Sequence, residues 1–474
     1  MSAILTVKSP YDHHFIREFP LAGEREIERA ISKAYDLFHD QSRWLHKYHR
    51  IEILERLAGL MEKQVEELTR IAAEEGGKPY RDSKVEVLRA INGVKIATAE
   101  LYNLRGEEIP MGMTAASVNR LAFTTREPIG VVFAISAFNH PLNLIIHQVI
   151  PAIATGCPVI VKPASSTPVS CFNLVRLLYE AGLPEAHCTA LVCRRDLAEK
   201  LSADPRIGYV TFIGSHAVGW HLRSILAPGT RIALEHGGVA PVIIDKSAEI
   251  EEIAPGIAKG GFYHAGQVCV SVQRVFVHEE IARPFAEKLA EIAANLKVGD
   301  PLDPQTDIGP MIAESEVNRV HDWVEEAKAT GAELLTGGQL ILNQSPPLPR
   351  FPASYSPTVL FAPPEHIKVS REEVFGPVIC VYPYSDLGDA ISKANNLRYA
   401  FQAAVFTRDI DMALETAQKL NASAVMINDH TAFRVDWMPF GGRDESGIGI
   451  GGIPYSMHEM TREKLIVMKS KGLI

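Results

Sequence analysis

The order of apolar and polar residues predicts a long helical segment near the start of the chain. Between residues 51 and 73, apolar side chains recur every three or four positions among Glu, Lys and Arg; they are Leu54, Leu57, Met61, Val65 and Leu68. This spacing is typical of an amphipathic helix with one buried stripe. The sequence Gly-Gly-Lys-Pro at 76–79 predicts the end of that helix.

From residue 129 onward, short apolar runs replace the helical spacing. Four such runs lie at 129–135, 159–161, 189–192 and 209–213, and the stretches between them are long enough for crossover helices. Wholly apolar runs of this length are typical of buried parallel strands. They predict βαβ units on a parallel sheet.

A second alternation of strands and helices follows. Strand-like runs at 241–244, 274–277 and 377–382 alternate with helical stretches near 248–260, 280–296 and 315–329. A second α/β domain is the simplest interpretation.

Two further segments depart from this alternation. Residues 340–357 are rich in Pro and Ser and predict a surface loop. Residues 117–123 alternate polar and apolar side chains, which is the pattern of a hairpin strand.

Composition and charge limit the classes of partner. A chain of 474 residues with 46% hydrophobic and 22% charged residues has the makeup of a soluble globular protein with more than one core. The net charge of −9 is modest and no Lys/Arg run dominates, so neither nucleic acid nor a membrane surface is expected as a partner. Residues 1–20 carry interspersed charges, which speaks against a signal peptide, and no apolar run reaches transmembrane length. Small molecules are the expected partners.

The six cysteines are sparse and have no framework spacing, which suggests reduced thiols in the cytoplasm. Cys188 and Cys193 are not followed by a second Cys/His pair at zinc-site spacing, so no metal is expected. Most unpaired cysteines are small buried hydrophobes. We keep that interpretation for every cysteine but one.

The exception is Cys269, which ends the sequence Gly-Gln-Val-Cys and lies 34 residues after Glu235. A thiolate can attack a carbonyl, and a carboxylate can activate water afterwards. These are the two groups needed to oxidise an aldehyde through a thioester. Glu235 ends an apolar strand-like run and precedes a Gly-Gly pair, where missing side chains leave room for a ligand.

Several segments together carry a family resemblance. They are the Cys269 and Glu235 sequences, Phe-Asn-His-Pro at 138–141, Val-Lys-Pro-Ala at 161–164, Glu-Glu-Val-Phe-Gly-Pro at 372–377 and Pro-Phe-Gly-Gly at 439–442. In this order and spacing the chain resembles the NAD(P)-dependent aldehyde dehydrogenase superfamily from about residue 40 to its end. The segment from Phe433 to Gly452 is most similar to the branch that handles lactaldehyde, phosphonoacetaldehyde and sulfolactaldehyde.

The resemblance implies a role for each catalytic residue. Cys269 is the nucleophile, and Glu235 is the general base that hydrolyses the thioester. The Asn139 amide and the Cys269 backbone N–H form the oxyanion hole. Lys162 holds the adenosine ribose and belongs to the same catalytic set.

The cofactor is expected to be NAD or NADP, with NAD favoured. Gly214, Ser215 and Gly219 follow a strand and open a helix, which suits a pyrophosphate, although an ordinary βα turn has the same pattern. By resemblance, Glu373 holds the nicotinamide ribose and Phe375 packs beside the ring. Ser165 stands where many NAD-preferring relatives have a glutamate that repels a 2′-phosphate, so NADP is not excluded.

The expected substrate pocket contains His140, Asn143, His147, Val268, Arg434 and Phe440. Relatives that oxidise apolar aldehydes have bulky hydrophobic residues after the oxyanion asparagine, whereas this chain has His140, Asn143 and His147. Polar groups left without partners over a hydrocarbon are unfavourable, so we expect a short polar aldehyde. Arg434 is a candidate for meeting a substrate anion. Val268 supplies no charge where the phosphonoacetaldehyde enzymes are expected to place an arginine.

The resemblance also implies an α/β fold with three parts: a Rossmann-like NAD(P)-binding domain (1–107 and 128–237), an α/β catalytic domain (238–445), and a small β extension for oligomerisation (108–127 and 455–474). The extension is expected to pair with a neighbouring subunit in a homodimer or homotetramer. Two alternatives stay open: a CoA-acylating aldehyde dehydrogenase, which typically lacks the glutamate base, and a catalytically silent homologue that acts as a binding or structural protein.

Overall fold

A six-stranded sheet forms the centre of the first half of the molecule. The computed structural model describes residues 3–342 and 352–473. The strand order is β21-β9-β8-β5-β6-β7, and every strand except β21 is parallel to its neighbours. The bounds are β5 Val131–Ile135, β6 Val159–Lys162, β7 Cys188–Ala190, β8 Ile207–Ile213, β9 Arg231–Glu235 and β21 Gly447–Ile448. The four predicted strands are confirmed to within two residues at each end.

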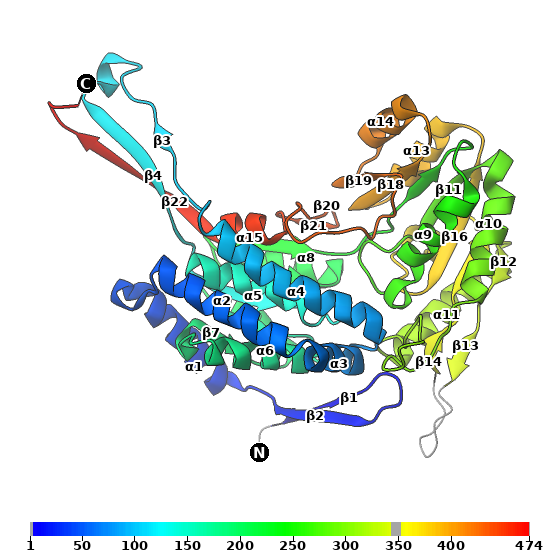
Figure 1. Cartoon of the computed structure of the whole chain (residues 1–474), viewed down its shortest axis with the longest axis horizontal. Coiled ribbons are helices and arrows are strands. Elements are labelled where there is room, and N and C mark those ends of the chain that lie inside the picture. Colours follow the sequence, from blue (N-terminus) through cyan, green and yellow to red (C-terminus); the bar gives the residue numbers. More distant parts are fainter. Residues whose placement is uncertain (1–2, 343–351, 474) are drawn as a thin grey trace.

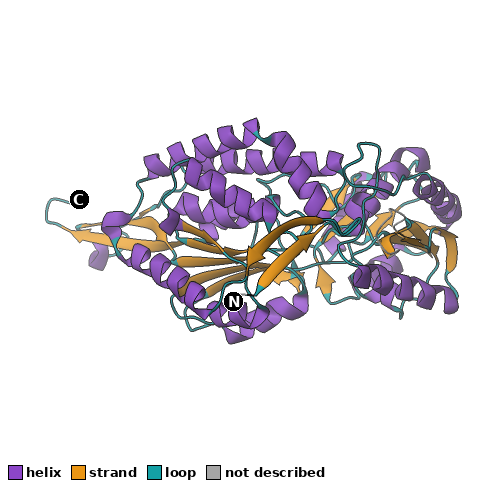
Figure 2. Ribbon diagram, turned by 90° about the horizontal axis from the view of Figure 1, so that it is seen from below, coloured by secondary structure: helices purple, strands orange, loops and turns teal. Residues whose placement is uncertain are grey.

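Helices cover both faces of this sheet (Figure 2). Alternate residues of β5 point to opposite faces: Val132 and Ala134 into one core, Val131 and Phe133 into the other. The first core is closed by α2 Lys47–Lys63, α3 Val65–Gly76, α4 Tyr80–Glu100, α5 Asn143–Thr155, α6 Val169–Glu180 and α15 Ile453–Glu459. The second core is closed by α1 Glu24–His39, α7 Arg195–Ser202 and α8 His216–Ile225.

The prediction of one helix over residues 51–73 is wrong. α2 ends at Lys63 and α3 begins at Val65, because Gln64 leaves the helical conformation with φ −115° and ψ 19°. The apolar stripe is nevertheless buried, apart from Val65, which is half-buried. Gly77 ends α3 in the left-handed conformation at φ 73°, as the Gly-Gly pair predicts.

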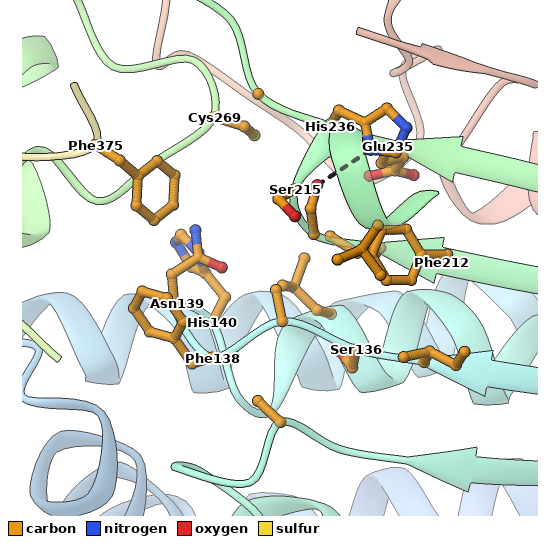
Figure 3. A pocket seen from close by; sticks show the side chains of 18 of the residues that line it. Ser136, Phe138, Asn139, His140, Phe212, Ser215, Glu235, His236, Cys269 and Phe375 are labelled. Atoms are coloured by element: carbon orange, nitrogen blue, oxygen red, sulfur yellow. Dashed lines mark hydrogen bonds between the residues drawn. The ribbon is translucent and has the colours of Figure 1, made fainter. Parts of the chain in front are cut away.

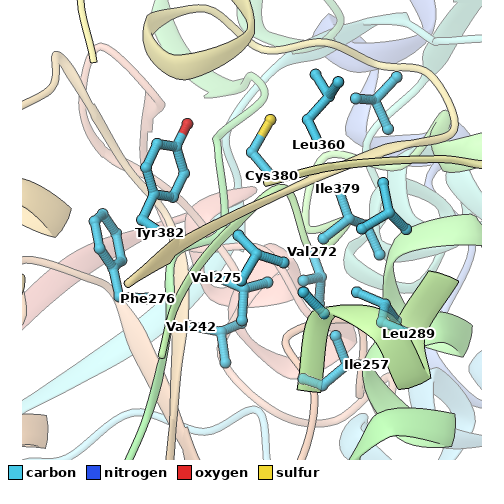
Figure 4. Packing of buried hydrophobic residues seen from close by; sticks show 14 of the residues in the cluster. Val242, Ile257, Val272, Val275, Phe276, Leu289, Leu360, Ile379, Cys380 and Tyr382 are labelled. Atoms are coloured by element: carbon cyan, nitrogen blue, oxygen red, sulfur yellow. The ribbon is translucent and has the colours of Figure 1, made fainter. Parts of the chain in front are cut away.

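A seven-stranded sheet forms the second half, in the order β12-β15-β16-β11-β10-β18-β19 with only β12 antiparallel among the strands of this sheet. Its strands are β10 Val242–Ile244, β11 Arg274–His278, β12 Glu333–Thr336, β15 Thr358–Phe361, β16 Val378–Tyr384, β18 Gln402–Phe406 and β19 Ala424–Ile427. Its helices are α9 Ile250–Phe262, α10 Glu279–Ala294, α11 Glu314–Ala329, α12 Lys368–Arg371, α13 Leu387–Asn395 and α14 Ile410–Lys419. Figure 4 shows Val242, Val275 and Ile379 of this sheet packed near Ile257 of α9 and Leu289 of α10. The predicted second α/β unit is confirmed.

A three-stranded antiparallel extension leaves the body of the molecule and carries the C-terminus at its tip (Figure 1). It consists of β3 Glu108–Ile109, β4 Arg120–Pro128 and β22 Thr461–Lys469, with β4 in the middle. The predicted strand over 117–123 begins only at Arg120, because Ala115–Ser117 form a turn of 3-10 helix and Asn119 has φ 62°.

The remaining strands form short antiparallel pairs. They are β1 Ile4–Lys8 with β2 Phe15–Pro20, β13 Leu340–Leu342 with β14 Pro352–Tyr355, and β17 Tyr399–Ala400 with β20 Arg443–Asp444. The prediction of a surface loop over 340–357 is therefore wrong at both ends, where backbone pairing forms a hairpin. Its middle, 343–351, lies outside the described residues. Within the described part of the chain, no helix is long and apolar enough to cross a membrane.

Candidate active site

A cavity of about 980 Å³ lies over the carboxyl ends of β5, β6, β8 and β9 and is closed from the other side by segments of the second sheet's half. The strand order of the first sheet reverses between β5 and β8. Open α/β sheets bind ligands at such a reversal, outside the carboxyl ends of the strands. Figure 3 shows Cys269, Asn139, Phe375 and Glu235 projecting from four different segments around this pocket. Fourteen of the sixteen candidate site residues line it; His147 and Gly219 do not.

Cys269 follows a tightly wound turn. His264, Ala265 and Gly266 have φ of 50°, 53° and 68°, and a side chain on Gly266 would overlap the carbonyl group of Gly376. Cys269 is half-buried, whereas the other five cysteines are buried. Burial raises the pKa of the Cys269 thiol to about 12, and the nearby Arg434 guanidinium opposes that rise. At neutral pH the group is therefore a thiol that needs help to lose its proton.

Glu235 is the last residue of β9, where it pairs with Ile213 of β8 and with Gly447 of β21. Its side chain lines the cavity, and the residue is half-buried. Burial raises its pKa above the usual range, and the positive charge of Arg434 works in the opposite direction. A carboxylate with a raised pKa is suited to take a proton from water.

Asn139 lies in the turn between β5 and α5 and is 6% exposed. Its Nδ2 donates to the backbone oxygen of Gln267, two residues before Cys269, at 2.8 Å. The second N–H of this amide is left for another acceptor. His140, the next residue, holds Tyr263 through a hydrogen bond of 3.0 Å between its Nε2 and the phenol oxygen.

A second region of the cavity matches the predicted cofactor site. Lys162 at the end of β6 has its pKa lowered by burial, and its Nζ donates to the Pro163 oxygen at 3.4 Å. Gly214 and Ser215 precede the first residue of α8, so the positive end of that helix faces the cavity beside them. Sequence reasoning missed Arg194 and Arg195, which also line this region. Their signal was an Arg-Arg pair one residue after the strand run at 189–192.

Glu373 and Phe375 lie near Cys269. Burial raises the pKa of the Glu373 carboxyl group to about 8, and within the described residues its Oε1 has no hydrogen-bond partner. A side chain on Gly237 would overlap this carboxyl group, so the Gly-Gly pair after Glu235 makes room for Glu373. Phe375 has φ 46°, and its ring lies edge-on to Phe138 with 5.9 Å between centroids.

The two candidates outside the cavity wall have other surroundings. A side chain on Gly219 would overlap the imidazole of His236, so glycine there lets His236 pack against α8. His236 in turn is hydrogen-bonded to the Gly214 oxygen at 3.1 Å (Figure 3). His147 lies on α5 behind the wall, and its Nε2 is 2.8 Å from Oδ1 of Asp436. The direct ligand contacts expected of Gly219 and His147 stay predictions.

Arg434 is a cation whose charge acts on both Cys269 and Glu235. Its guanidinium lies 3.5 Å from the centre of the Phe440 ring, and Nη2 lies 3.5 Å from Nδ1 of His147. Its Nε has no partner among the described residues, and burial lowers its pKa while Glu235 raises it. Val268, beside Cys269, is 8% exposed and belongs to the same apolar cluster as Phe440.

Asp436 neutralises a second cation, and sequence reasoning missed both partners. Arg89 of α4 donates to both carboxylate oxygens of Asp436, at 3.1 and 2.7 Å. Hydrogen bonds from Arg89 and His147 hold the pKa of Asp436 well below its usual range. Because Asp436 is already engaged, Arg434 is left without an ion-pair partner within the described residues. No group of three or more metal-ligating side chains occurs in the described ranges.

Comparison with known proteins identifies the family. The model of the aldehyde dehydrogenase family matches residues 2–466. The chain is 38% identical to 3-sulfolactaldehyde dehydrogenase of Priestia aryabhattai, over 98% of this chain and 94% of that protein. The structure is similar to aldehyde dehydrogenase 21 of Physcomitrella patens in complex with the reaction product succinate, with a TM-score of 0.94, 34% identity, and coverage of 100% of this chain and 96% of that chain.

A third similarity is to glyceraldehyde-3-phosphate dehydrogenase of Methanocaldococcus jannaschii complexed with NADP, with a TM-score of 0.92, 34% identity, and coverage of 99% of this chain and 100% of that one. The resemblance seen in the sequence is confirmed, including its sulfolactaldehyde branch. The chain belongs to the aldehyde dehydrogenase family and is an NAD(P)-dependent enzyme of that family.

Proposed function

We propose that this enzyme oxidises a short polar aldehyde, bearing a hydroxyl or an anionic group, to the free carboxylic acid. The observation that carries the proposal is the half-buried Arg434, whose Nε has no partner in the described part of the chain and which faces the cavity beside Cys269 and Glu235. A half-buried cation without an ion-pair partner and with an unsatisfied N–H is unfavourable until a ligand supplies an acceptor. A hydrocarbon would leave it unsatisfied, whereas a carboxylate, sulfonate or hydroxyl group would not.

The chain's own residues have these roles in the proposal. Cys269 first loses its proton to solvent, and the thiolate sulfur then attacks the aldehyde carbon. The oxygen that gains charge accepts hydrogen bonds from the free N–H of Asn139 Nδ2 and from the Cys269 backbone. Removing one donor of this kind costs on the order of 10²- to 10³-fold in rate. Loss of hydride leaves a thioester on Cys269. Glu235 then takes a proton from water, the water oxygen attacks the thioester carbon, and the Cys269 sulfur leaves.

The residues of the cavity suit a dinucleotide. When bound, NAD(P)⁺ supplies the hydride acceptor. Gly214 and Ser215 at the start of α8 would hold its pyrophosphate, Lys162 the adenosine ribose, and Glu373 the nicotinamide ribose. The unpartnered Oε1 of Glu373, within the described residues, is an acceptor that ribose hydroxyls would satisfy.

We propose that the enzyme uses NAD or NADP and favours NAD. Ser165 places no negative charge beside Lys162, and Arg194 and Arg195 line the same region of the cavity. Each arginine already has a carboxylate neighbour, Asp196 for Arg194 and Glu199 for Arg195, at 2.8 Å. The proposed site therefore tolerates the 2′-phosphate of NADP. NAD lacks this phosphate and needs no additional cation there.

Two relatives support a polar substrate class. One relative is named for a sulfonated aldehyde, and a similar structure holds succinate, a dicarboxylate product. In this chain Asn143 is 2% exposed and its Oδ1 has no partner among the residues described, which adds a polar group to the same wall as Arg434. Val268 is uncharged, so Arg434 is the proposed anion contact.

The proposal extends to the division of the chain and to its assembly. Residues 1–107 and 128–237 would bind the dinucleotide, 238–445 would carry the nucleophile, and 108–127 with 455–474 would pair with a neighbouring subunit in a homodimer or homotetramer. Leu465 and Val467 on β22 are about half exposed, at 55% and 49%, as an unpaired apolar strand face would be. We place the enzyme in the cytoplasm, where its free thiols stay reduced.

The test is NAD(P)H formation by purified enzyme over lactaldehyde, glycolaldehyde, glyceraldehyde 3-phosphate, phosphonoacetaldehyde, succinic semialdehyde and hexanal, each with NAD and NADP. A short polar or anionic aldehyde should give the highest kcat/KM, and Cys269→Ala should abolish turnover. Free acid without a requirement for CoA would support hydrolysis by Glu235 over acyl transfer. Best turnover with hexanal would refute the substrate class, and no turnover with any aldehyde would favour a silent homologue.

A further inference from the structure

A fully buried ion pair lies directly beneath the Asn139 turn. Lys78 and Glu86 are both 0% exposed at their side chains, and Nζ of Lys78 donates to Oε2 of Glu86. The same Nζ donates to the backbone oxygen of Asn139 at 3.3 Å. The other Glu86 oxygen, Oε1, accepts from the backbone N–H groups of Leu142 and Asn143, both at 2.9 Å. The pair therefore contacts the turn at its middle, through Asn139, and at its end, through Leu142 and Asn143.

Such a pair is costly as a purely structural element. Two charges removed from water seldom regain their full desolvation cost, and apolar residues of similar size often replace them without loss of stability. Burial lowers the pKa of Lys78, and Glu86 opposes that fall. We therefore attribute this pair to the conformation in which it holds the turn that contains Asn139.

The geometry in question is that of the Asn139 amide. One N–H of Nδ2 is used on the Gln267 oxygen at 2.8 Å, so the direction of the other N–H follows from the position of the Asn139 backbone. Strand β5 ends at Ile135 and α5 begins at Asn143, so the turn between them depends on contacts from other elements. Lys78 and Glu86 supply three of these contacts.

We propose that Lys78 and Glu86 are positioning residues for Asn139: they fix the turn so that the free N–H of its amide meets the substrate oxygen. This inference rests on the proposed function, because Asn139 must hold the charged oxygen for its position to matter. Neither side chain lines the cavity, so both act through Asn139.

The chain contains a matched control. Glu75 is also buried, at 1% exposure, and its two oxygens accept from the backbone N–H groups of Val169 and Ser170 at the start of α6, at 2.7 and 2.9 Å. It caps α6 as Glu86 caps α5. The helix it caps does not follow an active-site asparagine.

The experiment compares Lys78→Met, Glu86→Gln and Glu75→Gln in the full enzyme, each in the wild-type and in the Asn139→Ala background. We expect Lys78→Met and Glu86→Gln to lower kcat about 10- to 100-fold, less than the roughly 10²- to 10³-fold cost of removing one oxyanion donor, because the donor is displaced and not removed. The Kd for NADH and the rate of Cys269 alkylation by iodoacetamide should stay within twofold of wild type. Glu75→Gln, whose helix follows the turn with Lys162 and Ser165, should keep kcat and the rate of Cys269 alkylation within twofold of wild type.

The decisive comparison is in the Asn139→Ala background. There the same two substitutions should lower kcat less than threefold, because the group that they position is gone. A full additional 10- to 100-fold loss would overturn the positioning role, as would an equal loss in Glu75→Gln. Should Lys78→Met not fold, the isosteric Glu86→Gln carries the test alone.

Failure of the proposed function has a different signature. If Asn139→Ala alone kept wild-type kcat, the assignment of Asn139 as oxyanion donor would fall, and the positioning role with it. If Asn139→Ala were impaired but the losses added, only the positioning role would fall.

Discussion

Oε1 of Glu235 occupies the space in which a side chain on residue 451 would begin, so the position of the proposed base requires glycine at 451. Gly451 does not have a positive φ, so glycine is needed here for space rather than for backbone conformation. Hydrogen bonds in both directions with Phe440 hold its backbone, at 3.0 and 2.5 Å.

Gly451→Ala should therefore displace the Glu235 carboxyl group. We expect kcat to fall about 10- to 100-fold, since base catalysis of this kind is worth roughly 10²- to 10⁴-fold and the displaced carboxylate retains part of it. Alkylation of Cys269 by iodoacetamide should be unchanged, because in that reaction the sulfur attacks the reagent directly and no water molecule has to be activated by a base. The control is Gly59→Ala on α2, where a side chain meets open space and turnover should be unaffected. Unchanged kcat in Gly451→Ala would contradict the role of Glu235.

The reactivity of Cys269 should depend steeply on pH. Its pKa of about 12 means that the thiolate fraction grows about tenfold for each pH unit below that value. We expect the rate of iodoacetamide alkylation of the cofactor-free enzyme to rise in this way between pH 7 and 10. Arg434→Met should slow alkylation at pH 8, because it removes the charge that lowers the thiol pKa. A plateau reached below pH 8 would show that another group in the site already takes the proton.

Arg434 should control selectivity between anionic and neutral aldehydes. A hydrogen bond to a charged group is worth about 1.5–3 kcal/mol, so Arg434→Met should lower the kcat/KM ratio of anionic to neutral aldehyde about 10- to 100-fold. The ratio is the proper measurement, because any change in thiol pKa affects both substrates alike. Arg434→Lys should retain part of the preference. Arg283→Met, at an exposed ion pair with Glu287 and Glu333, serves as the control, and an unchanged ratio in Arg434→Met would exclude this contact.

Ser165 should control tolerance of the 2′-phosphate. Ser165→Glu adds a carboxylate at the wall that Lys162 shares, and we expect kcat/KM for NADP to fall about 10²-fold, on the order of 3 kcal/mol of repulsion and lost contact. The value for NAD should change less than threefold. Ser165→Gln has the same size without the charge and separates electrostatic repulsion from steric exclusion. Equal losses with both cofactors would contradict the assignment of Ser165.

Glu75 should make folding stability depend on pH. Burial raises its pKa to about 7, against about 4.5 in the unfolded chain. Between these values the folded protein holds a proton that the unfolded chain releases, so the free energy of unfolding decreases as pH rises from 4.5 to 7 and is then constant. The loss is about 3 kcal/mol.

Glu75→Gln removes this titration, so the variant should gain stability relative to wild type as the pH increases. Urea unfolding at pH 5 and pH 8 measures the difference. Parallel behaviour of the two proteins would show that Glu75 is ionised throughout, stabilised by its two backbone donors.

The local pattern of apolar and polar residues was sufficient to predict much of the fold. The apolar runs at 159–161 and 209–213 became β6 and β8, because a strand buried on both faces must be apolar at nearly every position. The break at Gln64 and the hairpin around 340–355 were missed. A continuous apolar stripe does not record a kink in the backbone, and backbone pairing needs no particular side chains.

The sequence by itself determined the family, because the segments around Cys269, Glu235 and Asn139 have the order and spacing of the aldehyde dehydrogenase family. Only the tertiary structure decided which groups meet: Arg89 reaches Asp436 across 347 positions of sequence, and Lys78 reaches Asn139 across 61. Such contacts leave no periodic trace, because any polar residue on a helix face looks the same in sequence whether it meets water or a partner. Burial of the charge, which makes the partner necessary, exists only in the folded chain.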